Sequence, residues 1–268
     1  MGNDAPIGVF DSGIGGLTVV KEIRQMLPAE DIIYVGDTAR VPYGSRDPEE
    51  IIVFMNQILR FFAQQKVKMA VIACNTMTGY GYEQAKDAYP YLLVPMDTVV
   101  GEAIAVSRDK SIGVIATEGA VQSHMHEKAA QKIDAKAVVH AKACPGFVPM
   151  IENGQIDGEQ MEIAVKEYLE YFADKGIGAL ILGCTHYPLI APIIRRYVDK
   201  DVQLINPAAA TAKDAVKALA AAGLLKESPA KGKMQMCFSA DLGKARKMAE
   251  LILKENTAVF KGIDLAEY

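Results

Sequence analysis

Short apolar runs alternate with longer amphipathic segments along the first part of the chain. Runs of this length, bounded by polar and small residues, are typical of strands buried on both faces of a parallel sheet. The segments between them carry apolar residues at helical spacing, which predicts helices that pack one face on that sheet. The predicted strands are Ile7–Phe10, Ile32–Val35, Ala70–Ala73 and Leu92–Pro95, and the predicted helices follow Gly16, begin after Asp47 and cover 79–88.

The helix after Asp47 has the clearest local signals. Asp47 suits the N-cap position, Pro48 the first helical position and Glu50 the third, where its charge favours the helix dipole. Five apolar residues then recur at a spacing that predicts one buried face: Ile51, Met55, Ile58, Leu59 and Phe62.

The same order of elements restarts in the second part of the chain. Ile112–Ala116 echoes Ile7–Phe10, and Ala179–Cys184 is a near-copy of Ala70–Cys74. Asp157 opens a second acidic helix start, and Gly176 is predicted to end that helix. Its predicted apolar face is Ile163, Val165, Leu169 and Phe172. Similar offsets between like elements in the same order predict two homologous, pseudo-symmetric α/β halves, each Rossmann-like with three layers and a mainly parallel sheet.

The last part of the chain has no third copy of this pattern. An alanine-rich helix is predicted from Pro207 to about Ala222, followed by the linker-like segment Lys226–Lys233, a strand at Met234–Phe238 and a helix that begins near Leu242. We expect this tail to pack on the first half. The predicted domains are therefore residues 1–98 with 208–268, and residues 99–207.

Composition narrows the function classes. The chain of 268 residues is 50% hydrophobic, with a formal charge of −4 and a pI near 5.7. These values argue against nucleic acid or an anionic membrane as the main partner, whereas a small-molecule substrate, even an acidic one, would need only a local polar site. No apolar stretch is long enough to span a bilayer and no secretory signal precedes the first strand, so we expect a cytoplasmic protein whose four cysteines form no disulfide.

Cys74 and Cys184 directly follow the two matching apolar runs. Residues at the carboxyl ends of parallel strands line the binding crevice of α/β folds. A lone cysteine there is more often a small buried residue, but a pair in matching positions favours a function. Two bases on opposite faces of one carbon perform stereoinversion, and a thiol with an ordinary pKa of about 8.5 can serve as either base when a helix amino terminus favours the thiolate. Cys144 and Cys237 lack this context and are interpreted as structural.

The polar neighbours of these cysteines suit an amino-acid ligand. Asp11 and Ser12 open the first turn between strand and helix, where an ammonium and a carboxylate could bind. Asn75, Thr76 and Thr185 add uncharged donors beside the thiols, and His186 could donate a proton to Cys184 or polarise it.

A nucleotide-binding module without catalysis is the alternative from another class. Gly13 and Gly15 follow the first strand, and Asp37 follows the second strand, where a ribose-binding acid would lie. Position 18 of this partial dinucleotide motif is Thr18 instead of glycine. The motif is therefore incomplete, and cofactor-free chemistry is the simpler expectation.

Several motifs together resemble the glutamate racemases of the aspartate/glutamate racemase family. They are Asp11–Gly16, Gly36–Gly44, Cys74–Thr76 and Gly183–Leu189, and the resemblance runs from about residue 6 to about residue 208. It implies two α/β halves with the active site in the cleft between them, no cofactor, no metal, and interconversion of L- and D-glutamate that supplies D-glutamate for peptidoglycan. It also suggests a homodimer.

The resemblance assigns roles to particular residues. Cys74 would act on the α-proton of one enantiomer and Cys184 on that of the other, assisted by Asp11 and His186 respectively. The positions that match substrate contacts in the family are Asp11, Ser12, Pro42, Tyr43, Gly44, Asn75, Thr76, Thr117, Glu152, Thr185 and His186.

Two departures and one alternative substrate accompany the resemblance. Met77 stands where the family usually has a small residue, and Ala120 replaces a threonine whose hydroxyl could bind a carboxylate. Aspartate remains open as the substrate, because it differs from glutamate by one methylene, which is typically worth about 1 to 3 kcal/mol. Since the chain begins shortly before its first predicted strand, we also expect no dependence on a cell-wall precursor as activator.

Overall fold

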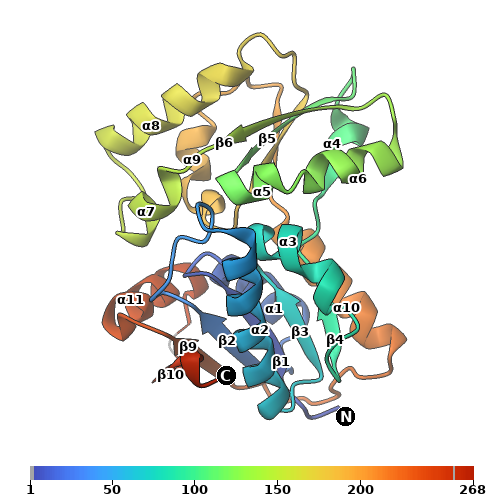
Figure 1. Cartoon of the computed structure of the whole chain (residues 1–268), viewed down its shortest axis with the longest axis vertical. Coiled ribbons are helices and arrows are strands. Elements are labelled where there is room, and N and C mark those ends of the chain that lie inside the picture. Colours follow the sequence, from blue (N-terminus) through green and yellow to red (C-terminus); the bar gives the residue numbers. More distant parts are fainter. Residues whose placement is uncertain (1–2, 256) are drawn as a thin grey trace. The chain divides into compact units, whose positions relative to one another are not determined.

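The structure is a computed structural model that describes residues 3–255 and 257–268. The chain forms two compact units. Unit 1 comprises Met1–Asp97 and Ala208–Tyr268, and unit 2 comprises Thr98–Pro207. Each is an α/β structure built around one parallel sheet, so the predicted fold class is confirmed (Figure 1).

The sheet of unit 1 has the strand order β10-β9-β2-β1-β3-β4, and every neighbouring pair is parallel. Its inner strands are buried on both faces, as their continuous apolar sequences predict. The strands are β1 (Ile7–Asp11), β2 (Ile32–Gly36), β3 (Met69–Ile72), β4 (Leu92–Val94), β9 (Met234–Phe238) and β10 (Val259–Gly262).

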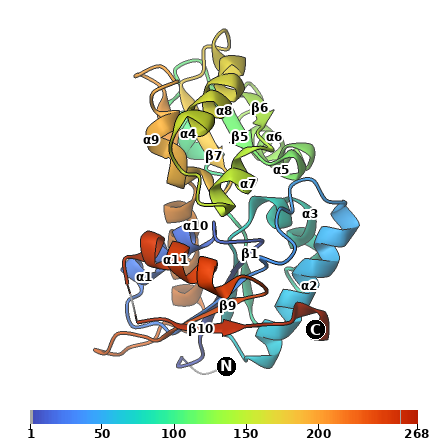
Figure 2. The same ribbon diagram turned by 90° about the vertical axis from the view of Figure 1, so that its left-hand side faces the viewer.

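Helices cover both faces of this sheet. On one face, α1 (Leu17–Met26) packs against α10 (Ala208–Ala221) and α11 (Leu242–Leu253). On the other, α2 (Pro48–Gln64) packs against α3 (Asn75–Ala85), and the short 3-10 helix η3 (Leu265–Glu267) lies beside α2 (Figure 2). Unit 1 therefore has three layers.

Helix α2 starts as its sequence predicts. The Asp47 side chain accepts a hydrogen bond from the Glu49 backbone N–H at 2.9 Å, and Pro48 occupies the first helical position. All five residues of its predicted apolar face are fully buried: Ile51, Met55, Ile58, Leu59 and Phe62.

The sheet of unit 2 has the order β6-β5-β7-β8, which repeats the order β2-β1-β3-β4 of unit 1. Its strands are β5 (Ser111–Ala116), β6 (Val138–Ala143), β7 (Ala179–Gly183) and β8 (Gln203–Ile205). Ile112 pairs with Val139 and Ala179, as Ile7 pairs with Ile32 and Met69. The repeat thus extends to the register of the strands.

Unit 2 also has helices on both faces of its sheet. On one face α4 (Val100–Val106) packs against α6 (Met125–Ile133), which follows α5 (Glu118–Gln122); on the other, α8 (Glu159–Leu169) packs against α9 (Ala191–Ile194) (Figures 1 and 2). The remaining elements are α7 (Phe147–Glu152) and the 3-10 helices η1 (Glu170–Phe172) and η2 (Tyr187–Ile190).

In each unit, one helix follows in sequence the fourth strand of the other unit. In sequence α4 follows β4 of unit 1, yet it packs on the sheet of unit 2. Conversely α10 follows β8 of unit 2 and packs beside α1 in unit 1. The two halves therefore exchange equivalent helices.

Two predicted helices differ in detail from those in the structure. Helix α3 begins at Asn75 instead of residue 79, because Asn75 and Thr76 are polar yet buried and so hide the apolar periodicity of the first turn. Helix α8 follows Gly158, whose φ is 88°, so Asp157 is not its N-cap. Its buried residues include Met161, Val165 and Leu169.

The predicted apolar face of this second helix was also partly wrong. Ile163 is 59% exposed, because Met161 and Val165 take the buried positions on either side of it. Gly176, with a φ of 58°, lies in the loop between η1 and β7 instead of ending the helix. Strands β6, β8 and β10 were not predicted, because each is short or only partly buried.

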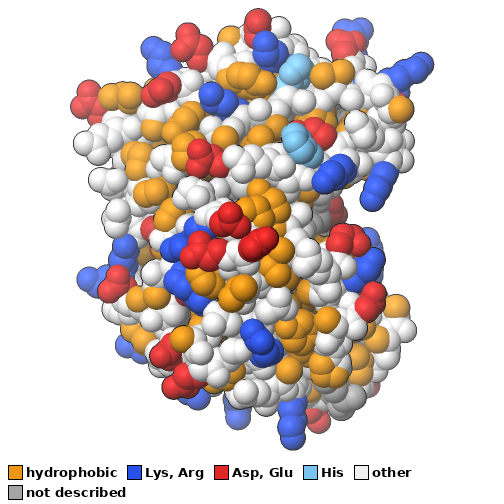
Figure 3. Space-filling model, in the orientation of Figure 1, with side chains coloured by type: hydrophobic (Ala, Val, Ile, Leu, Met, Phe, Trp, Pro, Cys, Tyr) orange, Lys and Arg blue, Asp and Glu red, His pale blue; other side chains and the backbone are white. Residues whose placement is uncertain are grey.

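Charges of both signs are interspersed over the face of the molecule drawn in Figure 3. Among the described residues, no helix combines the length and the apolar character needed to cross a bilayer.

Candidate active site

The two candidate thiols lie in equivalent positions of the two units. Cys74 follows β3 and Cys184 follows β7, the third strand of each repeat. The side chains of both cysteines are largely buried, with each residue 5% exposed. In each unit the neighbouring strand, β1 or β5, ends beside the thiol, since β3 pairs with β1 and β7 with β5. The topology therefore delivers both thiols to the carboxyl edge of a sheet.

In unit 2 the thiol is the first member of a line of three side chains. The Cys184 Sγ lies 3.6 Å from His186 Nδ1, and His186 Nε2 lies 2.7 Å from Glu152 Oε1. Glu152 is the last residue of α7, and His186 lies between β7 and η2. All three are buried, so the imidazole joins a thiol on one side to a carboxylate on the other in a dry environment.

This arrangement controls the charge of the imidazole. Burial alone would lower the pKa of His186, but the hydrogen bonds to Cys184 and Glu152 outweigh it, and the pKa is raised well above its ordinary value. The histidine therefore favours its protonated form, in which Nδ1–H can donate to a thiolate and Nε2–H to the carboxylate. A cysteine paired with such an imidazolium is suited to proton transfer.

In unit 1 an acidic residue, Asp11, ends the strand next to the thiol. Asp11 is the last residue of β1, and the Ala73 N–H donates to the Phe10 carbonyl at 2.8 Å, so the ends of β1 and β3 stay in step. One carboxylate oxygen of Asp11 accepts from the Gly16 N–H at 2.6 Å, which fixes the side chain in the turn before α1. Ser12 follows and is also buried.

Asn75 stands directly after the thiol, at the first residue of α3. It is 3% exposed, and among the described residues neither its amide nitrogen nor its amide oxygen has a hydrogen-bond partner. A buried polar group without a partner costs free energy, about 1 to 3 kcal/mol. The amide is therefore suited to a polar ligand beside Cys74, and the next residue, Thr76, is buried as well.

The predicted contact residues of the loop after β2, residues 42–44, differ in their burial. Tyr43 is buried, and its hydroxyl donates to a carboxylate oxygen of Asp37. Burial, and then the neighbouring Asp37 charge, raise the pKa of Tyr43 well above its ordinary value. Its phenol is thus part of the core, whereas Pro42, after a cis peptide bond, and Gly44 are half-buried in the loop.

The same loop decides against dinucleotide binding. Asp37 is fully buried, and its carboxylate accepts hydrogen bonds from Arg40 Nε, the Ser239 hydroxyl and Tyr43. It therefore cannot also bind a ribose. Thr18, in place of the third glycine, lies in α1 and donates to the Gly15 carbonyl at 2.8 Å. The sequence did not identify Arg40, whose guanidinium lies 3.9 Å from the centre of the Phe54 ring.

In unit 2, Thr117 occupies the position that corresponds to Ser12. It is the N-cap of α5, where its hydroxyl accepts from the Ala120 N–H at 3.2 Å. Ala120 is fully buried, and as an alanine it offers no side-chain hydroxyl. Thr185, between Cys184 and His186, is 3% exposed. The predicted residues of unit 2 thus gather around β5 and β7, with Glu152 brought in by α7.

Comparison with known proteins identifies the family. Residues 7–215 match the Asp/Glu/Hydantoin racemase family. The chain belongs to this family. It is 41% identical over 264 residues to the glutamate racemase of Thermoanaerobacter pseudethanolicus, covering 98% of both chains. It is 40% identical over 266 residues to glutamate racemase 2 of Caldanaerobacter subterraneus subsp. tengcongensis, again covering 98% of both.

Solved structures agree with this membership. A glutamate racemase from Francisella tularensis, in complex with D-glutamate, has a TM-score of 0.92 and 36% identity, with 99% of this chain and 100% of that chain covered. The isoform RacE1 from Bacillus anthracis has a TM-score of 0.93 and 34% identity, with 98% of each covered. The predicted resemblance is therefore confirmed.

The other two cysteines of this racemase-family chain have structural surroundings. Cys144 follows β6 and is fully buried, and burial raises the pKa of its thiol. Burial likewise raises the pKa of Cys237 in β9. The four cysteines all lie in the described part of the chain, and none forms a disulfide. Among the described residues no group of three or more His, Cys, Asp or Glu side chains is arranged to hold a metal ion.

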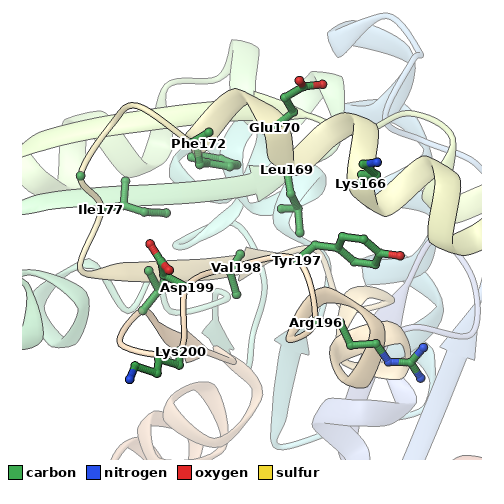
Figure 4. Close-up of a pocket in the computed structure, with 13 residues that line it drawn as sticks. Lys166, Leu169, Glu170, Phe172, Ile177, Arg196, Tyr197, Val198, Asp199 and Lys200 are labelled. Atoms are coloured by element: carbon green, nitrogen blue, oxygen red, sulfur yellow. The ribbon is translucent and has the colours of Figure 1, made fainter.

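A cavity of about 580 Å³ in unit 2 lies at the other end of the sheet. Ile177, which lines it, precedes β7, whereas Cys184 follows that strand. Figure 4 shows Leu169 of α8 pointing toward Tyr197 and Val198. None of the residues expected to contact substrate lines this cavity.

Proposed function

We propose that the protein is a cofactor-independent glutamate racemase that uses Cys74 and Cys184 as its two bases. Family membership supports amino-acid racemisation, and the Francisella tularensis relative, 36% identical, has been solved in complex with D-glutamate. Asp11 assists Cys74, while His186 with Glu152 assists Cys184. The expectation of a site between the two halves stays a prediction.

The observation that carries this proposal is the line Cys184–His186–Glu152 at the end of β7, together with a second thiol at the equivalent end of β3. A structural cysteine needs no imidazolium beside it. Two thiols in equivalent positions of repeated units also match a reaction that is itself nearly symmetric, because the substrate and product are mirror images.

The reaction is a balanced pair of proton transfers. One thiolate removes the α-proton, so that a C–H bond breaks, an S–H bond forms and the electron pair stays on the α-carbon. The thiol on the other face then gives its proton to that carbon, and its S–H bond breaks. The starting thiolate ends as a thiol and the starting thiol as a thiolate, so the reverse reaction begins from the product state.

The remaining predicted residues serve binding in this proposal. The amide of Asn75, without a partner among the described residues, and the hydroxyls of Ser12, Thr76, Thr117 and Thr185 bind the charged and polar groups of glutamate. Residues 42–44 contribute through the loop backbone, since the Tyr43 hydroxyl is already bonded to Asp37. Ala120 supplies no hydroxyl. Compared with a threonine at this position, the loss of one hydrogen bond to the substrate weakens binding by about 1 kcal/mol.

The biological setting follows from the same proposal. D-glutamate produced by the enzyme supplies peptidoglycan synthesis in the cytoplasm, and the enzyme acts as a homodimer without metal or cofactor. Light scattering of the purified protein tests the dimer. Turnover after dialysis against a chelator tests the cofactor-free reaction, and a fall in turnover that added metal restores would contradict it.

Proton NMR tests the activity directly. The purified, reduced protein is incubated in D2O with L-glutamate and, separately, with D-glutamate. We expect the α-proton signal to disappear from both and the optical rotation to decay to zero. Persistent α-proton signals with folded protein would rule out glutamate as substrate.

Aspartate is the second substrate to be tested, because the matched family includes aspartate racemases by its description. The relatives at 40% identity or above are named glutamate racemases, which favours glutamate. Faster α-proton loss from aspartate than from glutamate would reverse this order.

A further inference from the structure

The side chains around α7 form a second layer behind the Cys184–His186–Glu152 line. Glu152 reaches His186 only because α7 ends in the correct place, and α7 has just six residues. Its N-cap residue, Gly146, has no side chain to anchor the helix start. What holds α7 therefore decides the position of the carboxylate.

Tyr168 of α8 anchors that helix start. Its hydroxyl oxygen accepts a hydrogen bond from the Gly146 N–H at 3.2 Å. The lack of a side chain at Gly146 favours this approach, because a Cβ there would lie 3.1 Å from the same oxygen and would push it back by a few tenths of an ångström. Tyr168 is half-buried, so the bond is partly shielded from water.

Three aromatic rings in contact connect Tyr168 to the segment that holds Cys184 and His186. The Tyr168 ring packs edge to face on the ring of Phe147, the first residue of α7, with 5.0 Å between the ring centroids. Phe147 packs on Tyr187 in the same geometry, with 5.2 Å between the centroids. Tyr187 follows His186, and its hydroxyl donates to the Cys144 carbonyl at 3.1 Å. Such pairs contribute beyond their buried area and fix ring orientation.

We propose that Tyr168 is a positioning residue for the Cys184 half of the reaction: it fixes the start of α7 and so holds Glu152 in hydrogen-bond reach of His186. The inference rests on the proposed function. It assigns no direct contact with substrate to Tyr168, which acts through Gly146 and Phe147. The Cys74 half lies in the other unit and does not use this layer.

Steady-state rates cannot separate the two halves. The equilibrium constant of racemisation is one, so kcat/KM is equal for the two enantiomers in every variant. Single-cysteine variants separate them. In Cys74→Ala only Cys184 can take the α-proton, exchange it with D2O and return a deuteron to the same face, so that one enantiomer exchanges with retention. In Cys184→Ala only Cys74 can do so, with the other enantiomer.

The test adds Tyr168→Phe to each single-cysteine variant and follows α-proton exchange by NMR. We expect about tenfold slower exchange in the Cys74→Ala background, which is the effect of losing one neutral hydrogen bond in full. We expect no change in the Cys184→Ala background. A general loss of fold would slow both. Equal slowing in both backgrounds, or no slowing in either, would overturn the positioning role.

Two further variants make the outcome specific. Tyr168→Leu also removes the ring and should slow Cys184-dependent exchange further. Tyr171→Phe, nearby in η1 and 38% exposed, should leave both exchange rates unchanged. If the wild-type protein neither racemises nor exchanges glutamate, the proposed function fails. If it does and Tyr168→Phe acts on both halves alike, only the inference about Tyr168 fails.

Discussion

The two units place a cysteine at the same point of the same topology but surround it differently. In unit 2 the thiol meets His186, which is bonded to Glu152. In unit 1 the position equivalent to His186 is Thr76, and the acid instead ends the adjacent strand as Asp11. The position equivalent to Asp11 in unit 2 is Ala116. The sheet thus fixes the position of the thiol, while the loops set its partner independently in each half.

The opposite ends of the two sheets also differ. In unit 1 the residue before β3 is Lys68. Its side chain is fully buried, and its Nζ atom lies 2.6 Å from Glu30 Oε2. Lys68 also donates to the carbonyl of Leu224. In unit 2 the equivalent residue is Gly178, where a Cβ would lie only 2.7 Å from Ser107 Cα. In unit 1 a buried lysine thus forms an ion pair with Glu30 and a hydrogen bond to the carboxyl-terminal segment, whereas in unit 2 the backbone packs closely at this point.

The largest expected effect comes from removing either thiol. Cys74→Ala and Cys184→Ala should each reduce racemisation by more than about a thousandfold, because one face of the α-carbon loses its base. Circular dichroism should show an unchanged fold, and each variant should still exchange the α-proton of one enantiomer. Normal turnover in either variant would contradict the two-base reaction.

Glu152→Gln should affect the Cys184 half alone. Racemisation should fall about a hundredfold, since the imidazolium loses its charged partner. The pKa of His186, now raised by Cys184 and Glu152, should fall, as NMR of the labelled ring would show. A raised histidine pKa stabilises the folded state at pH values below the unfolded pKa of about 6.5, and this stabilisation is lost as the pH rises through the folded pKa. The free energy of unfolding of the variant should therefore fall less than that of the wild type as the pH is raised above about 6.5.

Lys68→Met should lower the stability of unit 1 and leave that of unit 2 unchanged. Removing one partner of a buried ion pair leaves an uncompensated charge, which typically costs about 3 to 5 kcal/mol. Urea unfolding should therefore show unit 1 strongly destabilised. Lys86→Met is the matched control, because Lys86 and its partner Glu83 are exposed and water screens such a pair, so that it contributes little to stability. Equal effects of the two substitutions would remove the contrast.

A smaller effect is expected from acid on unit 2. His126 in α6 is 2% exposed, and burial lowers its pKa to about 4. The unfolded chain binds a proton near pH 6.5 that the folded protein does not, so stability is complete above that pH and is lost as pH falls toward 4. Between pH 7 and pH 5 this amounts to about 2 kcal/mol. His126→Leu should lose that part of the acid sensitivity, as urea unfolding at the two pH values would show.

Sequence reasoning succeeded where local pattern and burial coincide. Both thiol strands and the repeat itself could be predicted from apolar runs, because strands buried on both faces leave few alternatives. The start of α2 could be predicted from its capping residues, Asp47 and Pro48. It failed where a segment is half-exposed. β6 has partly buried residues along most of its length, so neither an apolar run nor an alternation marks it.

The partners within the site lay mostly beyond sequence reasoning. Glu152 was identified through family resemblance, but its bond to His186 joins residues 34 positions apart and depends on how α7 is anchored. The Asp37 contacts with Tyr43 and Ser239 were also unpredicted, and they move a residue suspected of binding ribose into the core. Such contacts arise from tertiary packing, which no spacing rule encodes.

The exchange of α4 and α10 has a consequence for ancestry. Each follows the fourth strand of one repeat and covers the sheet of the other. A single repeat with this connectivity would lack one of the helices that cover its sheet, and a second copy would supply it. Two such chains make a domain-swapped dimer, a low-cost route to association. Joining two such repeats end to end yields the order of elements from β1 to α10, and it leaves residues 98–207 as one uninterrupted segment inside the other unit's sequence.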